Sequence, residues 1–298
     1  MKAKKSTLHA KLYPNTLLLP AGVLYVILFL VPTLLAFFFS MTRWTLFNFH
    51  WIGLQNFKNY FSDPNLSVGF RNTLIYAVVT SGLKVIIGLY LGNFLTSRIR
   101  TKGFLRSVVF FPVLVSTIGI GFTFSELMDP FHGMINVTIV WFAHLFGISM
   151  AGPGWLASNN LLPLLSVAFV DVWKGVGFAT VIYIAGIVSI PAEYYEASAI
   201  DGASARKQFY KITVPLIRPA MASVILLSFI GGLRSFDLIW AMTGGGPGFS
   251  SDVIASINYK QYEAGFYGLS TAGNVILFIG VMILVLPMSQ FLNRKSDI

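Results

Sequence analysis

The chain has 298 residues, of which 55% are hydrophobic and only 11% are charged, and its mean hydropathy is +0.73. A soluble globular protein carries roughly 25% charged residues, so this composition excludes an ordinary soluble domain and predicts a surface that faces lipid. The formal charge of +10 does not indicate nucleic-acid binding, because the cations are spread along the chain in short loops, and the absence of cysteine excludes disulfides and cysteine-based metal or nucleophile sites.

Six segments are long and apolar enough to cross a membrane, a task that needs ~20 mainly apolar residues. Lysines precede the first segment, as they precede the apolar region of a signal peptide. Its apolar core is too long for that role, however, and no small-residue cleavage site follows, so we expect a retained helix. To within a few residues, the predicted spans are 16–40, 72–95, 107–127, 161–190, 220–242 and 267–291.

The apolar stretch 135–148 is short, contains polar residues and is bounded by glycines, which is typical of an interfacial or re-entrant segment. With six spans, most cations fall on one side, which by the positive-inside rule is the cytoplasm and holds both termini. A seventh span at 135–148 would place the basic cluster 206–218 outside. The inner cations are Lys2, Lys4, Lys5, Lys11, Arg98, Arg100, Lys102, Arg106, Arg206, Lys207, Lys211, Arg218, Arg294 and Lys295, and the outer ones are Arg43, Lys58, Arg71 and Lys260.

This topology places the loops 42–70, 128–160 and 243–265 outside. Their aromatic residues are typical of the belt at a membrane–water interface. The same rings are also suited to dock an external partner or to stack on a sugar. They include Trp44, Trp51, Tyr60, Trp141, Trp155, Tyr259 and Tyr262.

The inner loop between the fourth and fifth spans predicts two short helices. Pro191 suits a helix start, and the acidic residues just after it favour the positive end of a helix. Gly202 then turns the chain. Phe209 and Ile212 share one side of the second helix, which Pro215 ends before Pro219 opens the next span. An ordered hairpin of this kind suits insertion into a groove on another protein, and a capped interfacial linker is the alternative.

The hairpin resembles the E-A-A loop of binding-protein-dependent ABC importer permeases, whose pattern is E-A-A-x-x-D-G-A followed by F, I, P and P. Ser198 replaces the second alanine, a small-for-small change. The resemblance implies an all-α membrane protein with the type I ABC importer permease fold and six transmembrane helices. It also implies that the coupling hairpin, about 191–219, sits in a cleft of a cytoplasmic ATPase. The expected coupling residues are Glu193, Glu196, Ala197, Ser198, Asp201, Gly202, Ala203 and Phe209.

Other stretches resemble the first subunit of maltose and multiple-sugar permeases. The run F-D-L-I-W-A-M-T-G-G-G-P at 236–247 is similar to the signature of that class, as are 53–57, 72–74 and the approach to Pro191 through Trp173. The resemblance implies import of a sugar or oligosaccharide across a bacterial cytoplasmic membrane. The implied partners are a second homologous permease, two ATPase subunits that use ATP and Mg, an extracytoplasmic sugar-binding protein and the lipid bilayer, with no nucleic acid.

Ionisable residues inside spans are costly, and their default interpretation is functional. Asp171 and Lys174 in the fourth span, and Arg234 and Asp237 in the fifth, are each three residues apart, so each pair is expected to meet on one helix face. At ~1.5 Å per residue the first pair lies about 15–20 Å, and the second about 8–12 Å, below the outer ends of their helices.

These four charges are therefore predicted to share a cavity in which a sugar ring stacks on aromatic neighbours. Helix–helix ties are the structural alternative. The excess of cations would suit an acidic saccharide, although the two aspartates weaken that inference. The predicted substrate-pathway residues are Lys84, Asp171, Trp173, Lys174, Arg234, Asp237 and Trp240.

No catalytic or metal site is expected, since the chain has no G-x-x-x-x-G-K-[ST] phosphate loop and its histidines lie on separate segments: His9, His50, His132 and His144. We expect the chain to bind no cofactor. The predicted organisation is a cytoplasmic tail at 1–15, a permease domain at 16–291 and a cytoplasmic tail at 292–298. The alternatives are a permease for a polyol or glycerol phosphate and a self-sufficient secondary transporter, which the lack of inverted repeats disfavours.

Overall fold

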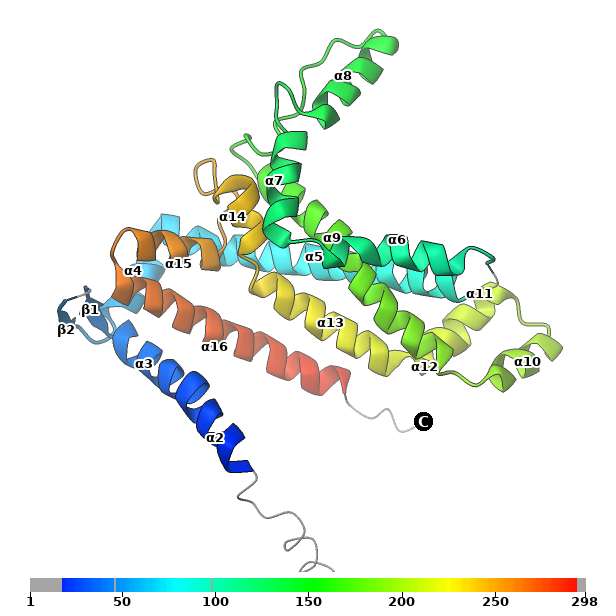
Figure 1. The fold of residues 1–298 in the computed structure, drawn as a ribbon, viewed down its shortest axis with the longest axis horizontal. Helices are drawn as coiled ribbons and strands as arrows, with labels where there is room; N and C mark the ends of the chain where they lie inside the picture. The colour runs from blue at the N-terminus through cyan, green and yellow to red at the C-terminus, as the bar shows by residue number, and fades with distance from the viewer. Residues whose placement is uncertain (1–17, 46, 98, 294–298) are drawn as a thin grey trace, which may run out of the picture.

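The computed structural model describes residues 18–293, except 46 and 98. Helices dominate this part of the chain (Figure 1), as the sequence predicted. A small antiparallel sheet joins β1 (Thr42–Trp44) to β2 (Phe49–Trp51), with Thr42 opposite Trp51. The predicted tail 1–15, residues 16 and 17 of the first span, and most of the predicted tail 292–298 lie outside the described residues. So do seven of the predicted inner cations: Lys2, Lys4, Lys5, Lys11, Arg98, Arg294 and Lys295.

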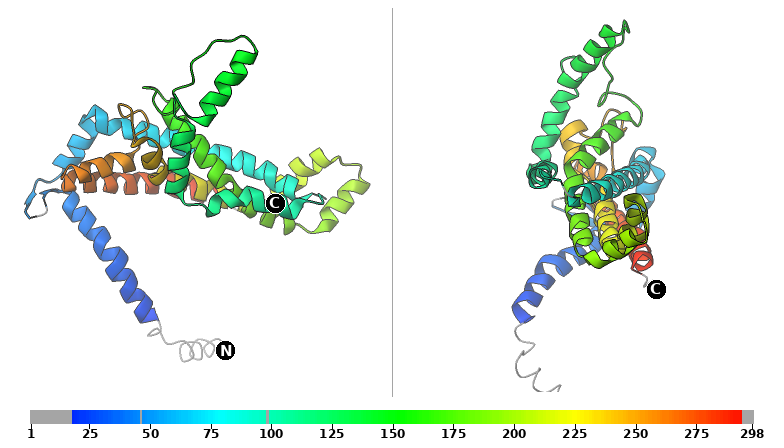
Figure 2. Two further views of the ribbon diagram at one scale, coloured as in Figure 1. Left: turned by 45° about the horizontal axis from the view of Figure 1, so that its top comes forward. Right: turned by 90° about the vertical axis from the view of Figure 1, so that its right-hand side faces the viewer.

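The first helix leaves the body of the molecule as an arm (Figures 1 and 2). It consists of α2 (Leu19–Tyr25), the π-helical stretch η2 (Val26–Leu30) and α3 (Val31–Ser40). Neither α2 nor η2 buries a residue. The arm meets the body through α3, where the rings of Phe37 and Phe278 lie 6.1 Å apart. A helix that is apolar and bare on all sides needs lipid or another protein around it.

The core forms where α5 (Pro64–Thr96) crosses α9 (Leu162–Val188), and α6 (Lys102–Leu114) and α13 (Arg218–Leu233) pack against this pair. The Asp63 side chain caps α5 by accepting a hydrogen bond from the Asn65 amide at 2.8 Å. With 33 residues, α5 begins eight residues before the predicted second span. The predicted fourth span agrees with α9 to within two residues.

Glycines let α5 and α9 approach closely. A Cβ atom at Gly88 would lie 2.9 Å from the Ala179 Cβ, and one at Gly92 would lie 2.8 Å from the Tyr183 Cβ. Small residues four apart on one helix face are a common device of membrane-helix packing. The backbone spacing of the core therefore depends on these two positions.

The third predicted span, 107–127, is wrong as a single straight helix. The chain forms α6 and α7 (Thr117–Leu127), which meet at an angle of 94°. Pro112 supplies no amide hydrogen to the last turn of α6, and Val115 is extended. Ser116 then caps α7 by accepting a hydrogen bond from the Gly119 amide at 3.5 Å. The apolar pattern runs through this break, and hydropathy alone therefore did not reveal it.

The fifth predicted span, 220–242, is also interrupted. α13 ends at Leu233, and a separate helix, α14 (Asp237–Thr243), begins after three non-helical residues. α13 itself meets the preceding helical stretch, Ala205–Leu216, at 71°. The first turn of α13 contains Pro219, close to the predicted start.

Three shorter helices connect the long ones, α4 (Gln55–Ser62), α8 (Met134–Leu145) and α15 (Ile254–Glu263), and the last helix is α16 (Tyr267–Leu292). With 12 residues, α8 is too short to span a membrane and extends away from the body (Figure 1), in keeping with the prediction for 135–148. Within the described residues, four helices are long and apolar enough to span, or six if each bent pair is one span. The chain is thus a multi-pass membrane protein.

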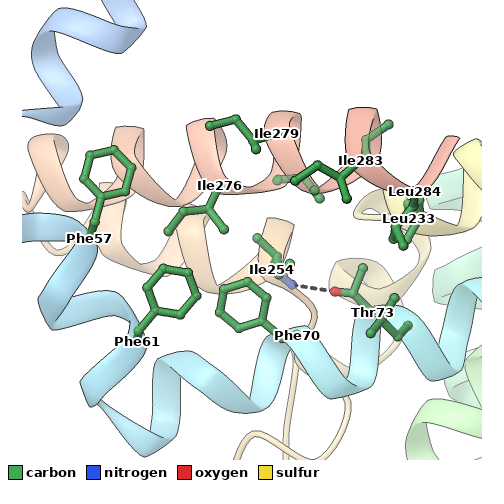
Figure 3. A pocket seen from close by; sticks show the side chains of 14 residues that line it. Phe57, Phe61, Phe70, Thr73, Leu233, Ile254, Ile276, Ile279, Ile283 and Leu284 are labelled. Atoms are coloured by element: carbon green, nitrogen blue, oxygen red, sulfur yellow. Dashed lines mark hydrogen bonds between the residues drawn. The ribbon is translucent and has the colours of Figure 1, made fainter. Parts of the chain in front are cut away.

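An apolar pocket of about 390 Å³ lies between α4, α5, α13, α15 and α16 (Figure 3). Thr73 is its one hydroxyl-bearing lining residue, and the Thr73 hydroxyl already accepts a hydrogen bond from the Ile254 amide at 3.0 Å. No charged side chain lines the pocket. It therefore offers nothing to a polar solute.

The glycine contacts predict that two glycines on α5 differ sharply in the stability lost when a larger side chain replaces them. Gly92→Val should destabilise the protein by about 1–3 kcal/mol, because the new side chain has to displace helix α9. Gly82→Val is the matched control, since a Cβ at Gly82 meets nothing within 4 Å. Thermal unfolding in detergent measures both. Equal losses of stability for the two variants would contradict the packing role of Gly92.

Candidate functional site

The predicted hairpin is present and lies at one end of the molecule (Figure 1). It consists of α10 (Ala192–Ile200), a turn at Gly202, and a continuous helical stretch made of α11 (Ala205–Gln208), η3 (Phe209–Thr213) and α12 (Val214–Leu216). Gly202 has a φ of +73°, the left-handed region that favours glycine. Pro191 directly precedes α10 rather than lying inside it, and the second helix ends one residue beyond Pro215.

Internal hydrogen bonds hold the two arms of the hairpin together. The Gln208 side-chain amide donates to the Ser198 hydroxyl at 2.8 Å and to the Tyr195 carbonyl at 3.2 Å. The hydroxyls of Tyr195 and Thr213 are 2.9 Å apart. The hairpin is therefore an ordered projection, able to transmit a push from one arm to the other.

The exposed surface of the hairpin is available to a partner. α10 buries none of its residues, and Ile200 at its tip is 89% exposed. The predicted coupling residues on this face are exposed: Glu193, Glu196, Ala197, Asp201 and Gly202. Ser198 and Ala203 are half-buried. Ile200 is a large apolar side chain that is almost fully exposed in the turn between two helices, and such a side chain indicates a contact surface.

Phe209 has a different place from the other predicted coupling residues. It is only 7% exposed, and its ring stacks on that of Tyr90 at 5.8 Å. The hydroxyls of Tyr90 and Tyr210 lie 3.2 Å apart. These contacts fasten the hairpin to the C-terminal part of α5. The sequence analysis missed both Tyr90 and Ile200, although a lone isoleucine next to a glycine turn was a usable signal.

The intramembrane charges pair differently from the prediction. Asp171 on α9 forms an ion pair with Lys84 on α5, with the Lys84 Nζ 2.7 Å from the Asp171 Oδ2. Gly175 leaves the space that the lysine chain occupies, since a Cβ there would lie 2.9 Å from the Lys84 Nζ. The predicted Asp171–Lys174 pair is wrong because Asp171 is turned toward α5, and the close helix contact brings Lys84 within reach.

The predicted Arg234–Asp237 pair is also absent from the described residues. Arg234 closes α13 and Asp237 opens α14, so they do not share one helix face. Lys174, Arg234 and Asp237 form no ion pair in the part of the chain described by the structure. Trp173 contacts Phe124 at 5.4 Å, whereas Trp240 stacks on Phe236 at 5.7 Å. Of the seven predicted pathway residues, the structure brings Lys84 and Asp171 into contact.

Tyr76 is a polar residue that the sequence analysis overlooked. It lies on α5, is fully buried, and has Asp171 and Ser235 near it. The Asp171 carboxylate and the Ser235 side chain are the polar groups that interact with its hydroxyl. The junction of α5, α9 and the α13–α14 break therefore holds a buried polar group beside the ion pair.

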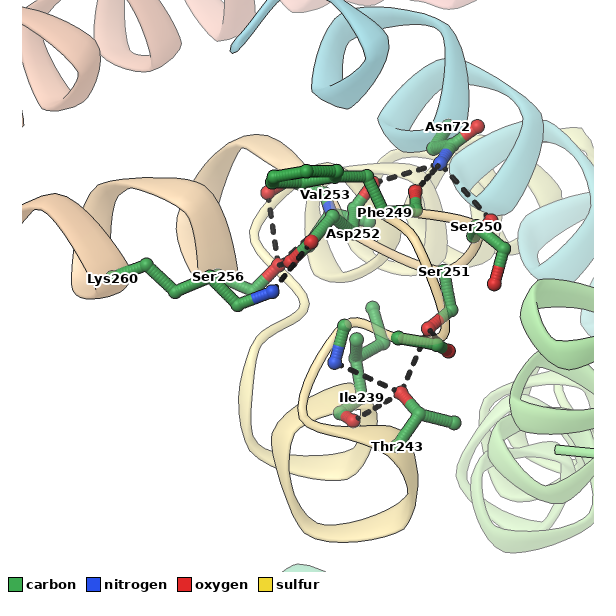
Figure 4. Close-up of polar contacts among 12 residues, drawn as sticks. Asn72, Ile239, Thr243, Phe249, Ser250, Ser251, Asp252, Val253, Ser256 and Lys260 are labelled. Atoms are coloured by element: carbon green, nitrogen blue, oxygen red, sulfur yellow. Dashed lines mark hydrogen bonds and ion pairs between the residues drawn. The ribbon is translucent and has the colours of Figure 1, made fainter. Parts of the chain in front are cut away.

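The signature stretch 236–247 leads into a loop locked onto α5 (Figure 4). The Asn72 side-chain amide donates to three carbonyl oxygens, those of Phe249, Ser250 and Asp252, at 3.3, 3.2 and 2.9 Å. The fully buried Asp252 pairs with Lys260 at 2.6 Å and accepts a hydrogen bond from Ser256 at 2.7 Å. Burial raises the pKa of Asp252, and the bonds from Lys260 and Ser256 offset part of that rise.

Comparison with known proteins consistently finds transport-system permeases. Residues 84–297 match the family described as "Binding-protein-dependent transport system inner membrane component". The chain is 30% identical over 268 residues to the trehalose/maltose transport system permease protein MalF of Thermococcus litoralis, covering 89% of this chain and 88% of that one. It is 30% identical over 288 residues to the multiple sugar-binding transport system permease protein MsmF of Streptococcus mutans, covering 95% and 96%.

A solved structure shares the fold. It is the bacterial alginate ABC transporter in complex with an alginate pentasaccharide-bound periplasmic protein, and the chain aligns with it at a TM-score of 0.78 and 20% identity. The alignment covers 95% of this chain and 94% of that one.

The Lys84–Asp171 ion pair predicts that replacing Lys84 and replacing Lys174 will have unequal effects on stability. Lys84→Met should destabilise the protein by about 3 kcal/mol, because it strands Asp171 in a largely buried site. Lys174→Met should leave stability nearly unchanged, as Lys174 has no ion pair in the described residues. The double variant Lys84→Met with Asp171→Asn should recover part of the loss. Thermal unfolding of the four proteins decides; a Lys84→Met variant as stable as wild type would refute the pairing.

Proposed function

The chain belongs to the family of inner membrane components of binding-protein-dependent transport systems, and on this premise we propose that it is one of two pore-forming permease subunits of an ATP-driven sugar importer. A separate cytoplasmic ATPase dimer hydrolyses ATP with Mg. An external binding protein delivers the sugar, and a second homologous permease completes the pore in a bacterial cytoplasmic membrane.

The exposed hairpin of α10 and α11 carries this proposal. A loop that only joined two spans would need neither a left-handed glycine nor hydrogen bonds between its arms. The hairpin presents Ile200 and the small residues of α10 on a projecting tip, which suits a cleft on a partner. Its attachment to α5 through Phe209 gives that partner a mechanical path into the core.

Six spans are proposed, with both termini in the cytoplasm. Four are the long helices, the bent pair of α6 and α7 supplies the third span, and α13 with α14 supplies the fifth. This count puts the hairpin, with its basic residues between 206 and 218, on the cytoplasmic side, in accord with the positive-inside rule. The permease domain at 16–291, between tails at 1–15 and 292–298, is the corresponding organisation.

The proposed mechanism is alternating access. Closure of the ATPase dimer pulls the hairpin, and the helices attached to it rock so that the central path opens outward to receive the sugar. The bends at 94° and 71° supply joints between otherwise stiff helices. The path is proposed to pass the intramembrane charges, where Lys174 and Arg234 have no ion pair within the described residues and are free to bind hydroxyl or anionic groups of the substrate.

The sugar assignment rests on the similarity to the trehalose/maltose and multiple-sugar permeases. For a permease of the same fold, the alternative cargo is a polyol or glycerol phosphate. A screen of the binding protein against all of these compounds distinguishes them, because that protein selects the cargo.

The hairpin turn offers a direct test of coupling. Gly202→Leu should abolish ATP-dependent uptake of a radiolabelled sugar (trehalose, maltose or maltotriose) in vesicles that contain the complete transporter. A side chain there forces the turn out of its left-handed conformation, at a strain of about 1–2 kcal/mol. The variant should still assemble in the membrane.

Gly147→Leu is the matched control. Gly147 also has a positive φ, +72°, and at both glycines a Cβ would meet nothing within 4 Å, so the strain is similar. It lies in the turn after α8, far along the chain from the hairpin. Uptake that persists in Gly202→Leu, or is lost equally in both variants, would contradict a specific coupling role.

A further inference from the structure

A file of six aromatic rings runs through the outer part of the molecule. Successive centroids are 5.6 Å apart from Trp44 to Tyr267, 5.2 Å on to Tyr262, 6.4 Å on to Tyr259 and 4.8 Å on to Trp240. Phe236 completes the inner end, 5.3 Å from Tyr259 and 5.7 Å from Trp240. The rings come from β1, α14, α15, α16 and the residue before α14, so folding alone brings them together.

These rings are not part of the core. Tyr262 is 55% exposed and Tyr259 37%, and the other four are half-buried. The tyrosines that do build the core are fully buried: Tyr60, Tyr76 and Tyr183. Six accessible rings in contact with one another form a continuous apolar ribbon rather than the isolated anchors of an interface belt.

A polar pocket of about 220 Å³ opens beside this file. Phe236, Tyr259 and Tyr262 line it together with the polar residues Asn258, Ser270 and Asn274. Amide and hydroxyl groups that faced lipid chains would lose their hydrogen bonds to water, which is unfavourable. The lining therefore suits a polar solute better than a lipid chain. A solute with both apolar faces and hydroxyls fits the lining.

The amides of the pocket are held in fixed orientations. Asn258 accepts a hydrogen bond from the buried Tyr60 hydroxyl at 2.8 Å and donates to the Asn274 Oδ1 at 2.9 Å. The Ser270 hydroxyl donates to the Asn258 carbonyl at 2.8 Å. The Asn274 side chain is exposed, and its NH₂ group has no hydrogen-bond partner among the described residues. It is a preset donor at the edge of the pocket.

The charge of this region is also informative. No charged side chain lines the pocket. The Glu263 carboxylate interacts with the Tyr259 hydroxyl and raises its pKa, and a phenol is neutral at physiological pH even without that rise. The lining therefore recognises rings and hydroxyls rather than carboxylates or phosphates.

We propose that the ring file with the Asn258–Asn274 pocket is a saccharide-binding track, on which sugar rings stack between the outer surface and the Arg234–Asp237 region. The proposal rests on the proposed function as a sugar permease and adds a binding site to it. The track holds the sugar released by the external binding protein until the central path accepts it. Stacking on successive rings lets a chain of several sugar units slide inward without leaving the protein.

The test is saturation-transfer difference NMR on the permease–ATPase complex in nanodiscs, without the binding protein, with trehalose, maltose and maltotriose as probes. Saturation should reach the ring C–H protons of a transported sugar in wild type. Tyr262→Leu and Asn274→Leu should each weaken binding by about threefold or more, as expected for the loss of one ring contact or one hydrogen bond.

Tyr25→Leu is the matched control, because Tyr25 on the arm has the same 55% exposure as Tyr262 but lies outside the file. Its binding should equal that of wild type. The ATPase rate of each complex checks assembly. Equal binding in all four proteins, or no saturation transfer from a sugar that the complete transporter takes up, would overturn the track. Failure to take up any of the three sugars would count against the proposed function itself, and the track would fall with it.

Discussion

The rest of the structure depends on the close contact between α5 and α9. Glycines at 88 and 92 bring the two backbones together, and that spacing lets Lys84 reach Asp171 across the interface. An intramembrane charge is tolerable when it is paired, so the same helix contact that packs the core also pairs its two charges. α13 and α6 then pack on this pair, and the signature loop is tied to the outer end of α5 through Asn72.

α5 thus links both ends of the molecule. Near its N-terminal end it anchors the loop that leads to α15 and the ring file, and near its C-terminal end Tyr90 holds the hairpin through Phe209 and Tyr210. A movement of the hairpin is transmitted to a helix of 33 residues, about 50 Å long at ~1.5 Å per residue. In the proposed mechanism, this helix carries the action of the cytoplasmic ATPase to the proposed sugar site on the other side of the membrane.

Hydropathy predicted where the apolar segments lie, because burial in lipid imposes its length requirement on each of them. It did not predict the break at Val115 or the one after Leu233, since both sit inside apolar runs and depend on local backbone geometry. The hairpin was predicted well because proline and glycine fix local conformation. The ion pairs were predicted wrongly because spacing along one helix says nothing of a lysine on another, and Lys84 lies 87 residues from Asp171.

The contact between the hairpin and an ATPase is the central claim, and cross-linking tests it most directly. The chain has no cysteine, so a single Ala197→Cys on exposed α10 gives a label without background, and Ala157→Cys, exposed in the stretch before α9, is the control. With a cysteine scanned along the ATPase cleft, Ala197→Cys should form a cross-linked permease–ATPase band whose yield changes with ATP, while Ala157→Cys should form none. Failure of Ala197→Cys to cross-link at any cleft position, or its labelling from outside intact cells, would contradict the account.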